Sequence, residues 1–175
     1  MEFPKRNKIS NKCSNADLFE KVYKQRICWK PEGLWYSSYD SWYNWIINVS
    51  GIKSWLYKFL YKINIKDDTK ISIYKKDKNK LLVIDNNKDF DIFFDKYKYN
   101  KKLISIGKCQ NTICINWKKV SKDYGGIEII PYLEDRREID WYYTWDVASG
   151  CIWNKKLLQN IVLIGKNENN KYIPI

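Results

Sequence analysis

The stretch Lys30–Trp45, KPEGLWYSSYDSWYNW, constrains the fold most, because turn formers, a strand pattern and a helix start follow one another within it. Its proline and glycine favour a turn. The residues Leu34–Ser37 have the aromatic and apolar composition of a short strand. Asp40 or Ser41 can then cap a helix. A turn, a strand and a capped helix in succession predict a cradle that could hold a ligand.

The two halves of this cradle have different expected roles. The helix places apolar side chains at the spacing of a buried face, which predicts that its tryptophans belong to the core: Trp42, Trp45, Ile46 and Val49. In the strand, Trp35 and Tyr36 alternate, so one of them should point away from the core. That residue would be available to stack on a flat ligand.

Composition predicts one folded domain. The 175 residues are 45% hydrophobic and 17% aromatic. That apolar content is ample to form a core. We expect residues 1–15 to be a flexible basic arm and residues 16–175 to form a single α+β domain. Its sheet should be mixed and mostly antiparallel, with three or four short helices, because alternating strand patterns and short amphipathic segments occur together.

Individual elements follow from hydrophobic periodicity. Phe59–Ile65 alternates as a half-buried strand, and Lys70–Tyr74 with Lys80–Ile84 has the pattern of a hairpin. A helix ending at Tyr97 places aromatic residues on one face, with Asp85 to Asn87 as its cap. Further elements are expected as follows: a helix over 17–23, strands over 25–29, 103–106, 127–131 and 161–165, and a helix over 116–124.

The residue types exclude several kinds of chemistry. The chain has no histidine, so a Ser-His-Asp triad, a histidine metal site and an imidazole base are excluded. Its five cysteines contain no CxxC pair, so no metal site is predicted and free thiols in a reducing compartment are expected. The start of the chain lacks a signal-peptide pattern and no apolar run is long enough for a membrane span. We therefore expect a soluble, cytoplasmic protein without membrane partners.

The formal charge of +12 suggests nucleic acid as a partner, because lysines neutralise phosphates. Lysine, asparagine, isoleucine and tyrosine are abundant throughout, however, and a solvated surface also explains most of the lysines. The oligomeric state and any acceptor substrate are not specified by these patterns.

Glu128 is a candidate functional residue because it lies between Ile127 and Ile129 in a strand pattern. Its side chain should face away from the two isoleucines. If they face the core, Glu128 faces solvent or a cleft. The segment WYYTWDVASGCIW, Trp141–Trp153, is a third region that packing alone does not fully explain.

GLWYSSYDSWYNW resembles the corresponding glycine, strand, serine and helix stretch of the poly-ADP-ribose polymerase branch of ADP-ribosyltransferases. Most of the chain also looks like uncharacterised phage and giant-virus proteins. The transferase resemblance implies Arg26, Ser37 and Glu128 as catalytic residues. It implies Gly33, Trp35 and Tyr36 as the binding wall for NAD, the substrate. The chain departs from that pattern in having no histidine and in placing Arg26 close to Ser37.

In this interpretation Glu128 would stabilise the oxocarbenium ion that forms when the nicotinamide–ribose bond of NAD breaks. Arg26 would anchor a phosphate or ribose, and the aromatic pair would stack on nicotinamide. One alternative is a nucleic-acid-binding module, in which Trp35, Tyr36 and Tyr39 stack bases. Another is a protein-interaction module that uses the acidic stretch around Arg136, Arg137 and the WDVASG turn.

Overall fold

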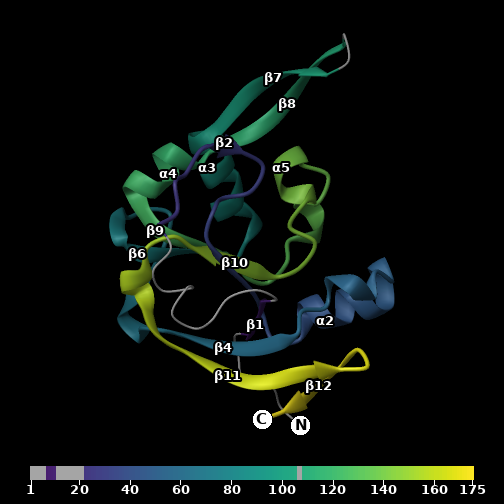
Figure 1. Ribbon diagram of the computed structural model, residues 1–175. Helices are drawn as coiled ribbons and strands as arrows, with labels where there is room; N and C mark the ends of the chain where they lie inside the picture. Colours follow the sequence, from purple (N-terminus) through teal and green to yellow (C-terminus); the bar gives the residue numbers. More distant parts are fainter. Residues whose placement is uncertain (1–6, 11–21, 106–107) are drawn as a thin grey trace.

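The computed structural model describes residues 7–10, 22–105 and 108–175, and its elements form a mixed α+β fold (Figure 1). The strands are β1 (Asn7–Ser10), β2 (Ile27–Cys28), β3 (Leu34–Ser37), β4 (Phe59–Ile65), β5 (Lys70–Ile71), β6 (Asp77–Ile84), β7 (Lys98–Ser105), β8 (Lys108–Asn116), β9 (Tyr124–Ile129), β10 (Ser149–Ile152), β11 (Leu158–Glu168) and β12 (Lys171–Pro174). The α-helices are α2 (Ser41–Trp45), α3 (Asn87–Tyr97), α4 (Trp117–Asp123) and α5 (Asp140–Tyr143). A π-helical turn covers Ile46–Ser50, and 3₁₀ turns cover Lys53–Trp55, Asp67–Thr69, Glu134–Arg136 and Lys155–Leu157.

Nine strands form the main sheet, in the order β12-β11-β4-β1-β3-β10-β9-β6-β5. Its pairs are antiparallel except for β9 with β6 and β6 with β5, so the prediction of a mixed, mostly antiparallel sheet is confirmed. The sheet curls, so that β4 and β11 lie below β9 and β10 in Figure 1, whereas α3, α4 and α5 lie above. Part of the predicted basic arm, Asn7–Ser10, forms β1 between β4 and β3.

The curled sheet separates two hydrophobic cores. The first core lies between the sheet and the helices, and it joins sheet residues such as Leu82 and Ile127 to Phe90, Trp117 and Trp141. The second core lies on the other face, and its members are Leu34, Tyr36, Tyr61, Ile63, Ile65, Leu81, Ile152, Leu157, Leu158 and Ile161. Because side chains alternate along a strand, β3 contributes to both faces.

Helix α3 forms as its sequence predicts. The side chain of Asn86 accepts a hydrogen bond from the backbone N–H of Asp89, which caps the helix start. Its apolar spacing buries Phe90, Phe93 and Tyr97 against the first core. Helix α4 is capped in the same way, since Asn116 accepts from the N–H of Lys119.

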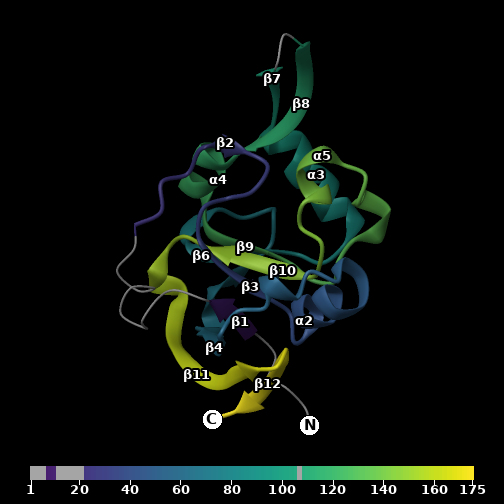
Figure 2. The same cartoon turned by 45° about the vertical axis from the view of Figure 1, so that its right-hand side comes forward.

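The predicted hairpin over residues 70–84 is wrong. Strand β5 pairs with β6 in parallel, with Lys70 opposite Leu81 and Ile71 opposite Leu82. The charged segment between them therefore returns the chain to the same end of the sheet. A hairpin does form where the sequence predicts only a brief strand: β7 and β8 make a long antiparallel ribbon that projects from the body (Figures 1 and 2). The predicted helix over residues 17–23 lies mostly outside the described residues.

The interpretation of Trp42 and Trp45 as core residues is also wrong. Helix α2 has no buried residue, and both tryptophans are half-buried at the surface. Asp40 occupies the N-cap position without a side-chain hydrogen bond to the helix. The helix start is held instead by the carbonyl of Ala148, which accepts hydrogen bonds from the Ser38 N–H and the Ser41 hydroxyl. The cradle is thereby tied to the segment that precedes β10.

Candidate binding site

A cavity of about 250 Å³ lies where β3 and β10 meet helix α2. Its lining combines aromatic side chains with a few polar groups: Lys30, Trp35, Tyr36, Ser37, Trp42, Tyr57, Trp145, Val147 and Ser149. Three of these residues belong to β3, and Ser149 begins β10. The cradle predicted from Lys30–Trp45 therefore does border a cavity.

Strand pairing brings the polar floor of this cavity together. Ser37 lies opposite Ser149, and Trp35 lies opposite Cys151, on the face of the sheet that carries the first core. Ser37 and Ser149 are both buried. Two hydroxyls are thus fixed side by side on rigid strands, which is a precise support for a bound group.

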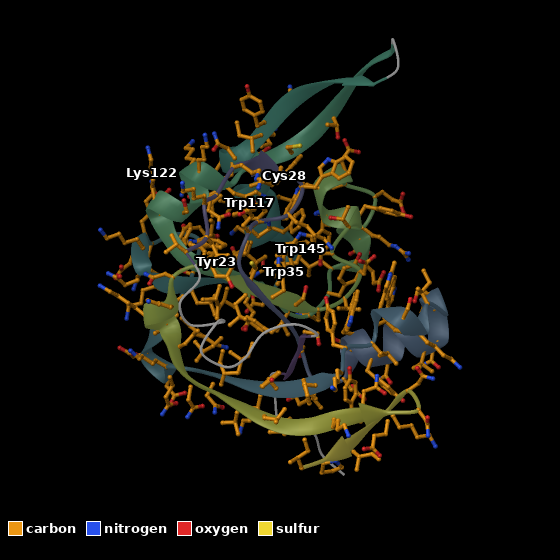
Figure 3. All side chains as sticks on the ribbon, viewed as in Figure 1. Tyr23, Cys28, Trp35, Trp117, Lys122 and Trp145 are labelled. Atoms are coloured by element: carbon orange, nitrogen blue, oxygen red, sulfur yellow. The ribbon has the colours of Figure 1, made fainter. Side chains whose placement is uncertain are left out.

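Two indole rings form a wall of the cavity. Trp35 and Trp145 meet edge to face with ring centroids 4.9 Å apart, and Figure 3 shows their side chains next to each other. The indole N–H of Trp35 donates to the carbonyl of Pro31 at 3.2 Å, so its ring orientation is fixed. The ammonium of Lys30 lies 5.5 Å from the centroid of the Trp35 ring. This separation is within cation–π range.

Three polar atoms of the lining residues have no hydrogen-bond partner in the described part of the chain: Nε1 of Trp42, Nε1 of Trp145 and Oγ of Ser149. Trp145 is 2% exposed and Ser149 is 4% exposed. Leaving such a group unpaired costs about 1–3 kcal/mol. Two of the atoms can only donate, because an indole nitrogen is not an acceptor. The cavity therefore matches a guest that offers hydrogen-bond acceptors.

A weak ion pair lies beside the aromatic wall. Nζ of Lys30 is 3.9 Å from the Asp146 carboxylate. Partial burial lowers the pKa of the Lys30 ammonium, and Asp146 opposes this. Burial likewise raises the pKa of the Asp146 carboxyl, against the influence of Lys30. Both charges are incompletely compensated, so an anionic group on a guest would stabilise the Lys30 ammonium.

Glu128 lies elsewhere. In the strand register Tyr36, Gly150 and Glu128 form one row across β3, β10 and β9. This row is on the face opposite to Ser37 and Ser149. The Tyr36 hydroxyl donates a 2.7 Å hydrogen bond to Glu128, and the Lys70 ammonium lies 3.2 Å from the other carboxylate oxygen. Glu128 is 2% exposed and is held in a buried polar network.

The predicted site residues are thus divided. Trp35 and Ser37 face the cavity. Tyr36 borders the cavity as well, but its side chain lies behind the sheet with Glu128. Arg26 is exposed and forms an ion pair with Glu32. Gly33 packs so tightly that a Cβ there would lie 2.5 Å from Sγ of Cys151. Its role is therefore close packing of β3 on β10.

Sequence reasoning misses several lining residues. Helical spacing assigns Trp42 to the core, no pattern singles out Tyr57, and Lys30 is predicted only as the first residue of the cradle stretch, without a role of its own. The segment Trp141–Trp153 does give a signal, because its aromatic residues and WDVASG turn exceed what packing needs. That segment contributes Trp145, Val147 and Ser149 to the lining.

No protein-family model, curated protein or solved structure matches this chain. Within the described residues, no cluster of three or more histidine, cysteine, aspartate or glutamate side chains could hold a metal ion. Nor does that part of the chain contain a helix both long and apolar enough to cross a membrane.

Proposed function

We propose that this protein is a binding module for single-stranded nucleic acid, which holds one unstacked base in the tryptophan-lined cavity. The observation that carries the proposal is the set of unpartnered polar atoms on Trp42, Trp145 and Ser149, in the described structure, inside an aromatic lining. A nucleobase is flat, stacks on indole rings and presents acceptors along its edges. It is therefore complementary to both features of the lining.

The size of the cavity supports a single nucleoside as the guest. Its volume is about 250 Å³. Pockets that hold drug-sized ligands start at roughly 300 Å³. A whole dinucleotide such as NAD would therefore extend well beyond this cavity.

Charge also supports a polyanionic partner. The Lys30 ammonium beside Trp35 is available to a phosphate of the same nucleotide. The chain as a whole has an excess of lysine and a formal charge of +12. Such an excess attracts the phosphate backbone of a nucleic acid strand.

NAD-dependent ADP-ribosyl transfer stays a prediction that this geometry supports less. Its three catalytic candidates, Arg26, Ser37 and Glu128, do not share one site. Arg26 is exposed and forms an ion pair with Glu32. Ser37 lies at the cavity, whereas Glu128 lies on the other face of the sheet. A stabilising carboxylate must face the reacting ribose. Loss of NAD turnover in Glu128→Gln, with the fold intact by circular dichroism, would restore that interpretation.

The binding proposal is tested by titrating the protein with oligothymidylate and measuring tryptophan fluorescence as the binding signal. Affinity should fall steeply between about 50 and 200 mM salt, because phosphate contacts release counterions. Trp145→Phe should weaken binding roughly tenfold, since the variant keeps an aromatic ring but removes the donor. It should not destabilise the protein by losing an internal hydrogen bond, because Nε1 of Trp145 makes none in the described structure.

Trp153→Phe is the matched control. Its indole N–H donates to the carbonyl of Tyr124 at 2.7 Å, outside the cavity. This variant should lose an internal hydrogen bond and keep its affinity, whereas Trp145→Phe should lose affinity without losing an internal hydrogen bond. Equal affinities for the wild type and Trp145→Phe would reject the cavity as the base-binding site.

A further inference from the structure

Three tryptophans beside the cavity form a platform of nearly parallel rings, made of Trp42, Trp45 and Trp55. The ring planes are inclined to one another by 16° for Trp42 and Trp45, and by 8° for each of the other two pairs. Their centroids are 5.2 to 6.4 Å apart. Trp42 also lines the cavity, so the tryptophan platform continues directly from the proposed base-binding site.

The local backbone explains how the platform forms. Helix α2 carries Trp42 and Trp45 on neighbouring turns and passes into the π-helical turn Ile46–Ser50. That turn closes with the N–H of Gly51 donating to the carbonyl of Ile46 at 2.9 Å. Gly51 has a φ of +68°. Glycine adopts this left-handed conformation without strain. The chain thereby reverses, and the next 3₁₀ turn brings Trp55 alongside the other two rings.

The platform is exposed at its outer end. Trp55 is 44% exposed. A tryptophan usually buries most of its surface. The surrounding segment, residues 41–62, contains three lysines, Lys53, Lys58 and Lys62, and no acidic residue. An accessible indole can stack on a base, and lysines without acidic neighbours attract the phosphate of the same strand.

We infer that Trp55 provides a second base-binding subsite, on which the nucleotide adjacent to the one in the cavity stacks. The inference rests on the proposed function and adds the path of the strand: from the cavity, past Trp42, to the platform. Lys53 belongs to the same 3₁₀ turn as Trp55 and is exposed, so it is placed to meet the connecting phosphate. The partner is a single strand of at least two nucleotides.

The experiment is a length series at constant salt, with thymidine monophosphate, the dinucleotide and longer oligothymidylates as probes. The wild type should gain on the order of tenfold in affinity when the second nucleotide is added. Trp55→Ala should lose this gain and keep the affinity for the monophosphate. Trp55→Phe should recover part of the gain, because it restores an aromatic face. An undiminished gain in Trp55→Ala would overturn the second subsite.

Ile52→Ala is the matched control, since Ile52 is 42% exposed in the same segment but has no aromatic face. It should retain the gain. An equal loss in Ile52→Ala and Trp55→Ala would mean a general apolar docking surface and would reject base stacking. Binding of anionic vesicles that depends on both residues, without a length effect for oligonucleotides, would instead identify a lipid surface and also reject the inference.

The two proposals fail in distinguishable ways. If the monophosphate binds and Trp145→Phe weakens it, but the second nucleotide adds nothing, the second subsite fails and the cavity site stands. If neither the monophosphate nor any oligonucleotide binds to the wild type, both fail. Thermal unfolding of each variant shows that changes in affinity do not arise from loss of the fold.

Discussion

Tyr36 reaches across Gly150 to donate its hydroxyl to the carboxylate of Glu128 at 2.7 Å. The three residues come from neighbouring strands and share one face of the sheet. Glu128 also lies 3.2 Å from the ammonium of Lys70. Since a buried carboxylate is stable only when it is paired and hydrogen-bonded, this row is a structural device that fixes β3 against β9.

Tyr36→Phe should therefore destabilise the protein by about 1–3 kcal/mol, because it leaves a buried carboxylate oxygen without this donor. Urea unfolding at neutral pH measures the change. Tyr74→Phe is the control, since Tyr74 donates to Asp89 at the exposed surface and should cost much less. A loss as small as that of the control would show that the Tyr36 bond contributes little.

Gly150→Ala should be destabilising for a steric reason. A Cβ at residue 150 would lie 2.4 Å from both Cζ and Oη of Tyr36, and a contact this short forces the ring to move. Overpacking of this kind typically costs about 1–3 kcal/mol. In a Tyr36→Ala background the methyl group should cost far less, so a double-mutant cycle should show strong coupling. Additive effects would contradict this explanation.

Ser149→Ala should leave the free protein equally stable or stabilise it by up to about 1 kcal/mol, because burying an unpartnered hydroxyl is unfavourable. The Ser149 hydroxyl is buried and has no partner in the described structure. The same variant should bind oligothymidylate more weakly. Ser121→Ala, on α4 and outside the cavity, should keep the wild-type affinity. A loss of stability in Ser149→Ala would show that the serine serves the fold.

Acid should weaken the link between α3 and the Glu134–Arg136 turn. The Arg136 guanidinium donates two hydrogen bonds of 2.7 Å to Asp91. These bonds hold the pKa of the Asp91 carboxyl below its ordinary value, against a smaller opposing effect of burial. A depressed folded-state pKa gives stability that is present above the unfolded pKa of about 3.9 and is lost as pH falls through the folded value. Asp91→Asn should thus lower the Tm at pH 7.

The difference in Tm between the wild type and Asp91→Asn should begin to shrink below about pH 4, where the unfolded wild type takes up a proton at Asp91. It should disappear once the pH is below the lowered folded-state pKa of this carboxyl, because the folded wild type is then neutral there as well. Arg136→Met supplies the control, since Asp91→Asn should have little further effect in that background. A difference that stays constant over this pH range would contradict the assignment.

Local patterns predicted much of the fold. The segments Leu34–Ser37 and Phe59–Ile65 are strands at the predicted residues. They could be predicted because the side chains of a strand point alternately to its two faces, a pattern that is visible among neighbouring residues of the sequence. The aromatic face of α3 follows equally directly from its spacing. Glu128 points away from Ile127 and Ile129, as its position in the strand requires.

The rest depended on contacts between distant parts of the chain. No local pattern indicates that β10 lies between β3 and β9. The hydrogen bond between Glu128 and Tyr36, which are 92 residues apart, therefore could not be predicted. The same applies to Trp42: helical spacing predicts an apolar face, but not whether other elements cover it. In the structure the ring of Trp42 is stacked against Trp55, which follows the turn at Gly51 and is itself exposed at the surface.

Strand β3 is a partition with a different neighbour on each side: Trp35 and Ser37 face the proposed guest, and Leu34 and Tyr36 support the second core. Substitutions behind such a partition can alter the width of the cavity without changing a single lining side chain. Engineering of ligand preference could therefore begin from the rear, at Gly150 and the Tyr36 ring that it contacts, as well as from the aromatic wall.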